Sequence, residues 1–420
     1  MSMWEAALSS FLRRLVRNGA LLVRYADGRV ERYGEAEAPA VILQFRDRRL
    51  ARALLVNPSL ALGEAYVNGW LTIDGDNLYG LLQLLLANCV RQRGLWHQRF
   101  LEAFRRISRH VQFNPPLRAR RNAAHHYDLS ERLYELFLDP DRQYSCAYFR
   151  RPDDSLEVAQ QAKKDHIAAK LLLKPGHRVL DIGCGWGGLA LHLARTSGAH
   201  VTGITLSQEQ YRAARARSHA SGLARRPTFL LEDYRRVTGT FDRIVSVGMF
   251  EHVGVPHYRQ FFSTVRDRLA EDGVALIHTI GRAHGPAPTD PWIAQYIFPG
   301  AAIPALSEIV PAIERTGLIL TDVEVLRLHY AATLKAWRDK FQTNRDRIRS
   351  IYDERFCRMW AFYLTVSELS FRYAGLVVFQ LQLTKRQDAV PLTRDYLAPE
   401  SSRMEPMIET RNVAKARAAW

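Results

Sequence analysis

The stretch V-L-D-I-G-C-G-W-G-G at residues 179–188 decides the fold of this chain. Its first half completes an apolar run that predicts a buried strand, and L-A-L-H-L-A-R at residues 189–195 predicts a helix. Four glycines lie within residues 183–188. Because glycine lacks a Cβ atom, a ligand can approach the backbone there, and the first N–H groups of the helix can donate to it. The stretch therefore predicts a nucleotide-binding turn.

The spacing of these glycines narrows the kind of nucleotide. G-x-G-x-G after Asp181 differs from the dinucleotide pattern G-x-G-x-x-G. It suits a nucleoside that carries an amino acid better than one that carries a pyrophosphate. A single glycine-rich loop is a weak signal, so a purely structural turn stays open as the alternative.

Five apolar segments, separated by helical stretches, predict a sheet around this turn. They read H-R-V-L-D-I (177–182), A-H-V-T-G-I-T (199–205), P-T-F-L-L-E-D (227–233), F-D-R-I-V-S-V-G (241–248) and G-V-A-L-I-H-T-I (273–280). Segments that are apolar throughout are typical of parallel strands buried on both faces. Residues 318–325 and 377–383 predict a final pair of strands. The predicted fold class is α/β, with a doubly wound, mostly parallel, Rossmann-like sheet.

Polar residues stand at the ends of all five segments. In a doubly wound sheet, ligands bind beyond the carboxyl ends of the strands. The residues at these ends are Asp181 and Gly183, Thr205 and Gln210, Asp233 and Tyr234, Glu251 and His252, and His278. Such a series favours a binding site over a purely structural turn.

The chain divides into four predicted parts. Residues 1–90 predict a small α+β domain, because alternating segments such as L-L-V-R-Y and A-V-I-L-Q-F suggest strands. Residues 91–122 predict a basic helical linker, closed by N-P-P, which cannot continue a helix. The catalytic domain is predicted over residues 123–390, and a C-terminal tail over residues 391–420.

The chain is strongly basic, with a formal charge of +16 over 420 residues. Residues 1–121 hold 19 Lys and Arg against 10 Asp and Glu, and no acidic residue occurs between Glu102 and Asp128. Such a surface attracts polyanions, either nucleic acid or an anionic membrane, although a merely solvated basic face is an alternative. No RNA-binding motif is visible, so we expect lipid rather than nucleic acid.

The spacing of the cysteines and the length of the apolar segments indicate the cellular compartment of the protein. Cys89, Cys146, Cys184 and Cys357 lie far apart and form no C-x-x-C pair, which suits a reducing cytoplasm. The N-terminus lacks the pattern of a secretory signal, and no stretch reaches the roughly 18 apolar residues of a membrane span. We expect a cytoplasmic protein that contacts the inner face of the membrane peripherally.

Several longer motifs accompany the glycine turn. They read H-H-Y-D-L-S-E-R-L-Y-E-L-F-L-D-P (125–140), Q-Y-S-C-A-Y-F (143–149), G-I-T-L-S-Q-E-Q (203–210), V-S-V-G-M-F-E-H-V-G (245–254), L-I-H-T-I-G (276–281) and W-I-A-Q-Y-I-F-P-G (292–300). Together they resemble the class I S-adenosylmethionine methyltransferases. More narrowly, they resemble the cyclopropane-fatty-acyl-phospholipid synthases and the mycolic acid cyclopropane synthases. L-G-E-A-Y-V-N-G-W (62–70) resembles the small domain of the phospholipid-acting synthases, which the mycolate enzymes lack.

The resemblance, which covers roughly residues 40–385, implies a class I methyltransferase fold that binds S-adenosylmethionine. The implied residues are Tyr144 and Ser145 beside the cofactor, Asp181, Gly183 and Gly185 in the turn under its methionine part, Thr205, Leu206 and Gln210 on the ribose side, and Tyr234 and Arg235 near the adenine. The acidic residue that usually binds the ribose hydroxyls is absent after the second strand. We expect His252 to be structural.

The resemblance also implies a buried bicarbonate ion and no metal. Its ligands would be Cys146, Glu251, His278, Ile280 through its backbone, and Tyr330. An anion there could take a proton from a carbocation and stabilise its charge. Glu251 would orient His278 or accept the proton from bicarbonate. Inert packing is the alternative for Cys146, and no metal-ligand spacing joins these residues.

These implications predict an enzyme that adds a methylene unit from S-adenosylmethionine to a cis double bond of a membrane phospholipid, giving a cyclopropane fatty acid. Alternatives are a methyl- or methylene-branching fatty-acyl phospholipid methyltransferase and, less favoured, a non-catalytic lipid-binding protein. Residues 292–300 could wall an acyl-chain tunnel or form ordinary core. A homodimer is expected only from the resemblance.

Overall fold

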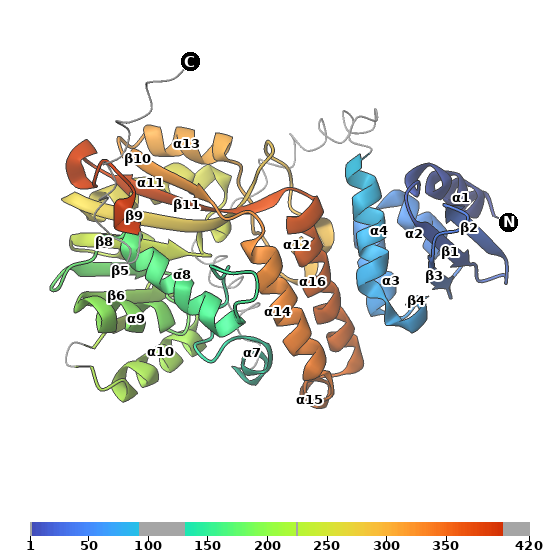
Figure 1. The fold of residues 1–420 in the computed structure, drawn as a ribbon, viewed down its shortest axis with the longest axis horizontal. Coiled ribbons are helices and arrows are strands. Elements are labelled where there is room, and N and C mark those ends of the chain that lie inside the picture. The colour runs from blue at the N-terminus through green and yellow to red at the C-terminus, as the bar shows by residue number, and fades with distance from the viewer. Residues whose placement is uncertain (1, 92–130, 224–225, 398–420) are drawn as a thin grey trace, which may run out of the picture.

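The computed structural model describes residues 2–91, 131–223 and 226–397. They form two sheets surrounded by helices (Figure 1). Most of the predicted linker at 91–122 and of the predicted tail at 391–420 lies outside the described residues. The four domain boundaries therefore stay predictions.

The N-terminal part is a small α+β unit, in agreement with the predicted fold class. Its elements are α1 (Met3–Leu15), β1 (Ala20–Arg24), β2 (Val30–Gly34), β3 (Ala40–Phe45), α2 (Leu50–Val56), α3 (Pro58–Val67), β4 (Leu71–Ile73) and α4 (Leu78–Arg91). The sheet order is β2-β1-β3-β4, in which β1 and β3 are parallel and the outer pairs antiparallel.

The larger sheet confirms the predicted α/β class. Its strands are β5 (Arg178–Ile182), β6 (His200–Thr205), β7 (Thr228–Leu231), β8 (Phe241–Val247), β9 (Leu269–Arg282), β10 (Ile319–Val325) and β11 (Leu376–Thr384), in the order β10-β11-β9-β8-β5-β6-β7. The first five pair in parallel, and β11 is antiparallel to both β9 and β10. Strand β5 lies between β6 and β8, so the chain order reverses there, which is where doubly wound sheets bind ligands.

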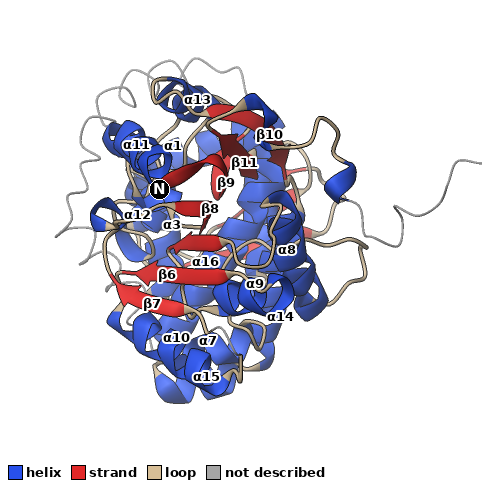
Figure 2. Ribbon diagram, turned by 90° about the vertical axis from the view of Figure 1, so that its left-hand side faces the viewer, coloured by secondary structure: helices blue, strands red, loops and turns tan. Residues whose placement is uncertain are grey.

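Helices cover both faces of this sheet (Figure 2). One layer contains α8 (Leu156–Lys170), α9 (Gly188–Ser197) and α10 (Gln208–Ala220), and the other contains α11 (Tyr258–Arg268) and α13 (Leu306–Glu314). Successive strand residues alternate between the two: Val245 packs with the first layer and Ile244 with the second. Both are fully buried, which explains why the strands read as continuous apolar runs.

A further group of helices joins the N-terminal unit to the large sheet. It comprises α7 (Glu131–Phe137), α12 (Pro291–Tyr296), α14 (His329–Thr343), α15 (Arg345–Ile351) and α16 (Glu354–Tyr373). Helix α16 packs against α14 on one side and against α3 and α4 on the other (Figure 1). The Trp292 ring of α12 lies 4.6 Å from that of Phe362, and the Tyr296 hydroxyl donates to Glu64 of α3 at 2.7 Å. Trp292 is therefore part of the hydrophobic core, which was one of the two alternatives for residues 292–300; the other was the wall of an acyl-chain tunnel.

We predict that Gly63→Ala destabilises the protein although alanine is the better helix former by about 1 kcal/mol. A Cβ atom at Gly63 would lie 2.4 Å from the ring of Trp292, which is buried and cannot move away freely. The free energy of unfolding, measured in urea, should fall by about 1–3 kcal/mol. Gly285→Ala is the control, because a Cβ atom there meets nothing within 4 Å. An unchanged or raised midpoint for Gly63→Ala would contradict the close packing.

Candidate active site

The glycine turn has the conformation that its sequence requires. Gly183, Gly185 and Gly187 all have positive φ, at 84°, 55° and 81°, a region that other residues rarely adopt. A Cβ atom at Gly183 would lie 2.9 Å from Met249, whereas one at Gly185 would meet nothing within 4 Å. Helix α9 begins at Gly188. The predicted strand, turn and helix are confirmed, with open space beside Gly185 for a ligand.

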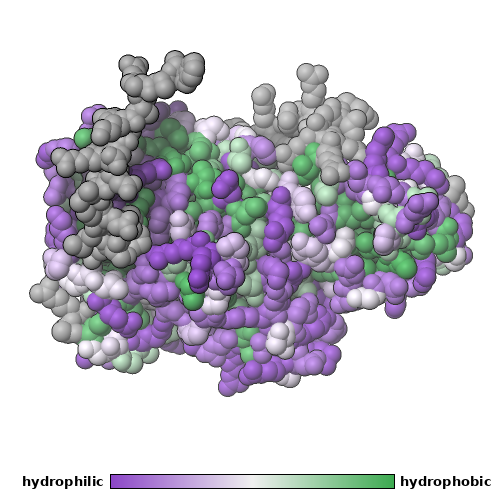
Figure 3. Space-filling view, in the orientation of Figure 1, coloured by the Kyte–Doolittle hydropathy of each residue, from purple (hydrophilic) through white to green (hydrophobic). Residues whose placement is uncertain are grey.

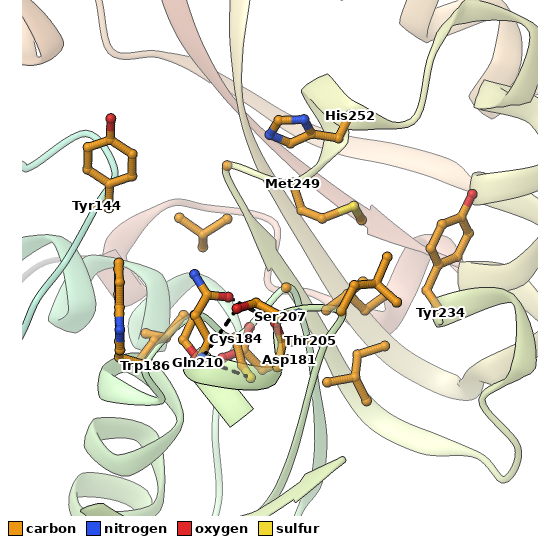
Figure 4. A pocket seen from close by; sticks show the side chains of 18 of the residues that line it. Tyr144, Asp181, Cys184, Trp186, Thr205, Ser207, Gln210, Tyr234, Met249 and His252 are labelled. Carbon is orange, nitrogen blue, oxygen red and sulfur yellow. Dashed lines mark hydrogen bonds between the residues drawn. The ribbon is translucent and has the colours of Figure 1, made fainter. Parts of the chain in front are cut away.

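A pocket opens over this turn, and all ten residues of the predicted cofactor site line it. They are Tyr144, Ser145, Asp181, Gly183, Gly185, Thr205, Leu206, Gln210, Tyr234 and Arg235. Tyr144 and Tyr234 stand on opposite sides of the pocket, and Trp186 lies below Tyr144 (Figure 4). The ends of β5, β6, β7 and β8 thus supply one continuous wall. Which part of a ligand each residue touches stays a prediction.

The pocket also includes residues outside the predicted cofactor set. Met249 and His252 line it from the segment after β8, and Trp186 from the glycine turn (Figure 4). The strand-end pattern had named His252, although we expected a structural or surface role for it. Burial lowers the pKa of His252 to about 4, so its ring is neutral at pH 7. Met249 follows the same strand end, which was the signal that could have identified it.

A hydrogen-bond network fixes the loop after β6. The Thr205 hydroxyl donates to the Gln210 side-chain oxygen at 2.9 Å, and the Ser207 side chain accepts from the Gln210 N–H at 3.3 Å. Since its oxygen is engaged, the Gln210 amide group has its NH2 left for the pocket. The end of β6 therefore presents the NH2 donor of Gln210 in place of the acidic residue that usually binds the ribose hydroxyls there.

Arg235 does not face the pocket as a free cation. Its guanidinium donates to both carboxylate oxygens of Asp233, at 2.8 and 2.6 Å, and lies 5.3 Å from the centre of the Tyr234 ring. This bidentate pair holds the segment after β7 in place. Arg235 thus positions Tyr234 whatever else it contacts.

Asp181 is the buried carboxylate of the pocket. One of its oxygens is buried without a hydrogen-bond partner, and burial raises its pKa to about 7, against the lowering effect of Lys163. An unpaired buried carboxyl group is costly unless a ligand satisfies it. It fits a ligand that brings a hydrogen-bond donor, such as the amino or hydroxyl groups of S-adenosylmethionine.

None of the five residues predicted to hold bicarbonate lines the pocket. Cys146 and Tyr330 belong to one buried cluster, against which Ile280 also packs. Ile280 donates its N–H to a Glu251 carboxylate oxygen at 2.6 Å. The backbone donor that an anion was expected to use is therefore engaged by the protein's own carboxylate. Within the described residues, no group of three or more His, Cys, Asp or Glu side chains could hold a metal ion.

Glu251 and His278 are both buried, and burial shifts the pKa of each in the direction that favours its neutral form. Burial raises the pKa of Glu251 to about 7, and its second carboxylate oxygen is buried without a partner. Burial lowers the pKa of His278 to about 3. The Gln380 amide nitrogen lies 3.1 Å from His278 Nδ1, and because an amide NH2 only donates, the ring proton sits on Nε2. Glu251 can therefore accept a proton, and His278 can donate a hydrogen bond.

Cys146 is unsuited to act as a nucleophile. Its thiol is buried and donates to the Ala147 carbonyl oxygen at 3.3 Å, and burial raises its pKa. A thiol that stays protonated is a weak nucleophile and a weak hydrogen-bond donor. Any part it has in the site is through packing or hydrogen bonding.

The fold and the pocket together define a class I S-adenosylmethionine-dependent methyltransferase. The family model for mycolic acid cyclopropane synthetase matches residues 116–381, and a model described as a domain of unknown function matches residues 7–95. The chain belongs to the mycolic acid cyclopropane synthetase family.

Relatives match over most of the chain. It is 39% identical over 352 residues to the cyclopropane-fatty-acyl-phospholipid synthase of Escherichia coli strain K12, covering 83% of this chain and 88% of that protein. It is 34% identical over 394 residues to the tuberculostearic acid methyltransferase UfaA1 of Mycobacterium tuberculosis, covering 90% and 91%. The crystal structure of mycolic acid cyclopropane synthase CmaA1 with SAH and CTAB has a TM-score of 0.61 at 34% identity, covering 65% of this chain and 99% of that one.

We predict that Glu251→Gln stabilises the protein more at about pH 8.5 than at about pH 5.5. The native pKa of Glu251 is raised from 4.5 to about 7, so the native state loses stability as the pH rises from about 4.5 to about 7, and the full loss is present above pH 7. The amide removes that charge, and the gain at high pH should be about 1–3 kcal/mol in unfolding free energy. Denaturant unfolding at both pH values measures it.

Glu324→Gln is the control of opposite sign. Burial alone would raise the pKa of Glu324, but His166 and Lys170 lower it to about 2. This replacement should lose stability at both pH values. An equal change at both pH values for Glu251→Gln would contradict a raised pKa at that residue.

Proposed function

We propose that this enzyme transfers a methylene unit from S-adenosylmethionine to the cis double bond of an unsaturated acyl chain in a membrane phospholipid, and forms a cyclopropane ring. The chief support is a synthase of that name which matches 83% of this chain. The buried carboxyl group of Glu251, one oxygen of which has no hydrogen-bond partner, is the structural feature that suits the chemistry.

The chemistry requires a proton acceptor in a site without water. A cis double bond is a poor nucleophile, so it must be held against the sulfonium methyl group. Methyl transfer leaves a carbocation, and ring closure needs loss of a proton from the new methyl group. A bicarbonate ion held by Cys146, Glu251, His278 and Tyr330 would take that proton, and Ile280, the fifth predicted ligand, would have to release Glu251 to bind the ion through its N–H. Glu251, with its pKa raised to about 7, is suited to receive it next.

A branched product is the second candidate. UfaA1, which matches 90% of this chain, carries the name of a tuberculostearic acid methyltransferase. The same carbocation gives a methyl-branched alkene when a neighbouring chain carbon loses its proton, and a methylene branch when a hydride shifts before the methyl group loses its proton. These outcomes and ring closure share the methyl transfer and the carbocation.

We further propose that the enzyme acts peripherally on the inner, anionic face of the membrane, as a possible homodimer. The N-terminal unit exposes large apolar side chains, among them Met3, Trp4, Phe11, Val56 and Trp70, and Figure 3 shows apolar surface over this unit. In the described part of the chain, no helix is long and apolar enough to cross a membrane. The basic residues of the predicted linker lie outside the described residues.

Purified protein, incubated with unsaturated phospholipid vesicles and S-adenosylmethionine, should yield fatty acids heavier by one methylene unit. Mass spectrometry of the released acids detects the product, and NMR separates a ring from a branch. Glu251→Gln should lower turnover by about 10²–10⁴-fold, because the proton acceptor is lost. It should leave S-adenosylhomocysteine binding nearly intact, since Glu251 does not line the pocket. Absence of any heavier acid with the wild type would refute the proposed function.

Binding to vesicles that contain anionic lipid should weaken as salt is added, because surface charges about 10 Å apart are screened at about 0.1 M. Sedimentation with vesicles at increasing salt measures this, and zwitterionic vesicles are the control. Salt-independent binding would instead favour insertion of apolar side chains.

A further inference from the structure

Lys163 is a buried lysine that touches the pocket from behind. It lies on α8 with its side chain fully buried. Its ammonium group donates to the side-chain oxygen of Gln143 at 2.6 Å and to the hydroxyl oxygen of Ser145 at 2.8 Å. Both partners line the pocket. A lysine so placed needs a reason, because burying an ammonium group is costly.

Helix α8 holds the whole segment 139–145 through side chains on one face. Gln160, one turn before Lys163, donates to the backbone oxygens of Gln143 and Ser145 at 3.2 and 3.0 Å. Lys164 pairs with Asp141 at 2.6 Å. This segment has no regular secondary structure of its own, so the contacts of Gln160 and Lys163 with Ser145 set the position of that residue.

The contact determines which way the Ser145 hydroxyl acts. An ammonium group carries only donors, so the Ser145 oxygen must accept from it. The hydroxyl proton of Ser145 is then left to donate to another acceptor. Because Ser145 lines the pocket, an acceptor on the ligand can receive it.

The charge of Lys163 is not neutralised by a direct partner. Within the described residues, no carboxylate lies in ion-pair contact with Lys163. Among the carboxylates, Asp139 has the largest electrostatic effect on Lys163, but its oxygens accept from the N–H groups of Asp141 and Gln143. The carboxylate of Asp141 pairs with Lys164 and Arg217. Burial lowers the pKa of Lys163 to about 8, so it stays charged at pH 7. Asp139 and Asp141 act on Lys163 only at a distance, and so does Asp181 in the pocket. A positive charge without a direct ion-pair partner therefore lies behind Ser145, which favours an anionic group there.

We propose that Lys163 is a positioning residue for the α-carboxylate of S-adenosylmethionine, which it orients by making Ser145 a hydrogen-bond donor to that carboxylate. Of the cofactor's groups, only the carboxylate is both anionic and an acceptor without a donor. The inference rests on the proposed function and on the predicted position of the methionine part over Gly183 and Gly185, in the pocket that Ser145 also lines. Lys163 does not line the pocket itself, and its effect is specific to the carboxylate end of the ligand.

The test compares two ligands that differ only in the carboxylate. Calorimetry measures the dissociation constants of S-adenosylhomocysteine and of decarboxylated S-adenosylhomocysteine. Lys163→Met should weaken the first by about ten- to a hundredfold, the range for a hydrogen bond to a charged group, and the second by less than about threefold. Lys164→Met is the matched control, since Lys164 contacts neither Ser145 nor Gln143, and it should leave the ratio between the ligands unchanged.

A second variant separates positioning from general damage. Ser145→Ala should show the same ligand selectivity, and Lys163→Met added to it should cost little more, because the two residues act as one unit. Equal weakening of both ligands by Lys163→Met, or unchanged S-adenosylhomocysteine binding by Ser145→Ala, would overturn the proposal. If Lys163→Met does not fold, the Ser145→Ala result alone decides. Failure of the wild type to bind S-adenosylhomocysteine would instead refute the cofactor site itself.

Discussion

The site depends on one backbone constraint, the left-handed turn that follows β5. Three glycines with positive φ bring the chain from the strand into α9, and Met249 packs so closely on Gly183 that a side chain there would collide with it. Because β5 lies between β6 and β8, this turn sits where the sheet order reverses. The ends of four parallel strands then face one pocket, and every cofactor contact that we propose follows from that arrangement.

Burial sets the protonation states of the groups around this turn. Asp181 and Glu251 have pKa values raised to about 7, and those of His252 and His278 are lowered to about 4 and 3. The apolar surroundings thus keep most of these groups neutral or near neutrality, and Lys163 is the buried cation among them. In the reaction that we propose, a site that leads a carbocation to one product benefits from few competing charges and from the weakly basic carboxylate of Glu251.

The N-terminal unit is built into the same structure as the site. Helix α3 contacts α12 through Gly63 and Glu64, and α12 is followed by Phe298, whose ring lies 6.1 Å from that of His252 and 5.9 Å from that of Tyr363. The Tyr363 and Tyr144 hydroxyls are 2.8 Å apart. Packing therefore runs without a break from the small sheet to the pocket. A change in the N-terminal unit has a physical route to the cofactor site.

The sequence by itself determined the strands, the glycine turn and the polar residues at the strand ends. Strand ends follow from apolar runs, and parallel strands with a fixed order place those ends together, so local pattern and topology were sufficient for them. The other predicted cofactor residues, such as Tyr144 and Ser145, came from the resemblance to the family, and they too line the pocket. The tertiary structure alone decided what depends on packing between distant segments. The contact of Lys163 with Ser145, the engagement of Ile280 by Glu251, and the pairing of His278 with Gln380 join residues up to 102 positions apart. No periodicity or spacing encodes such contacts, because they arise only when α8, β9 and β11 pack around the turn.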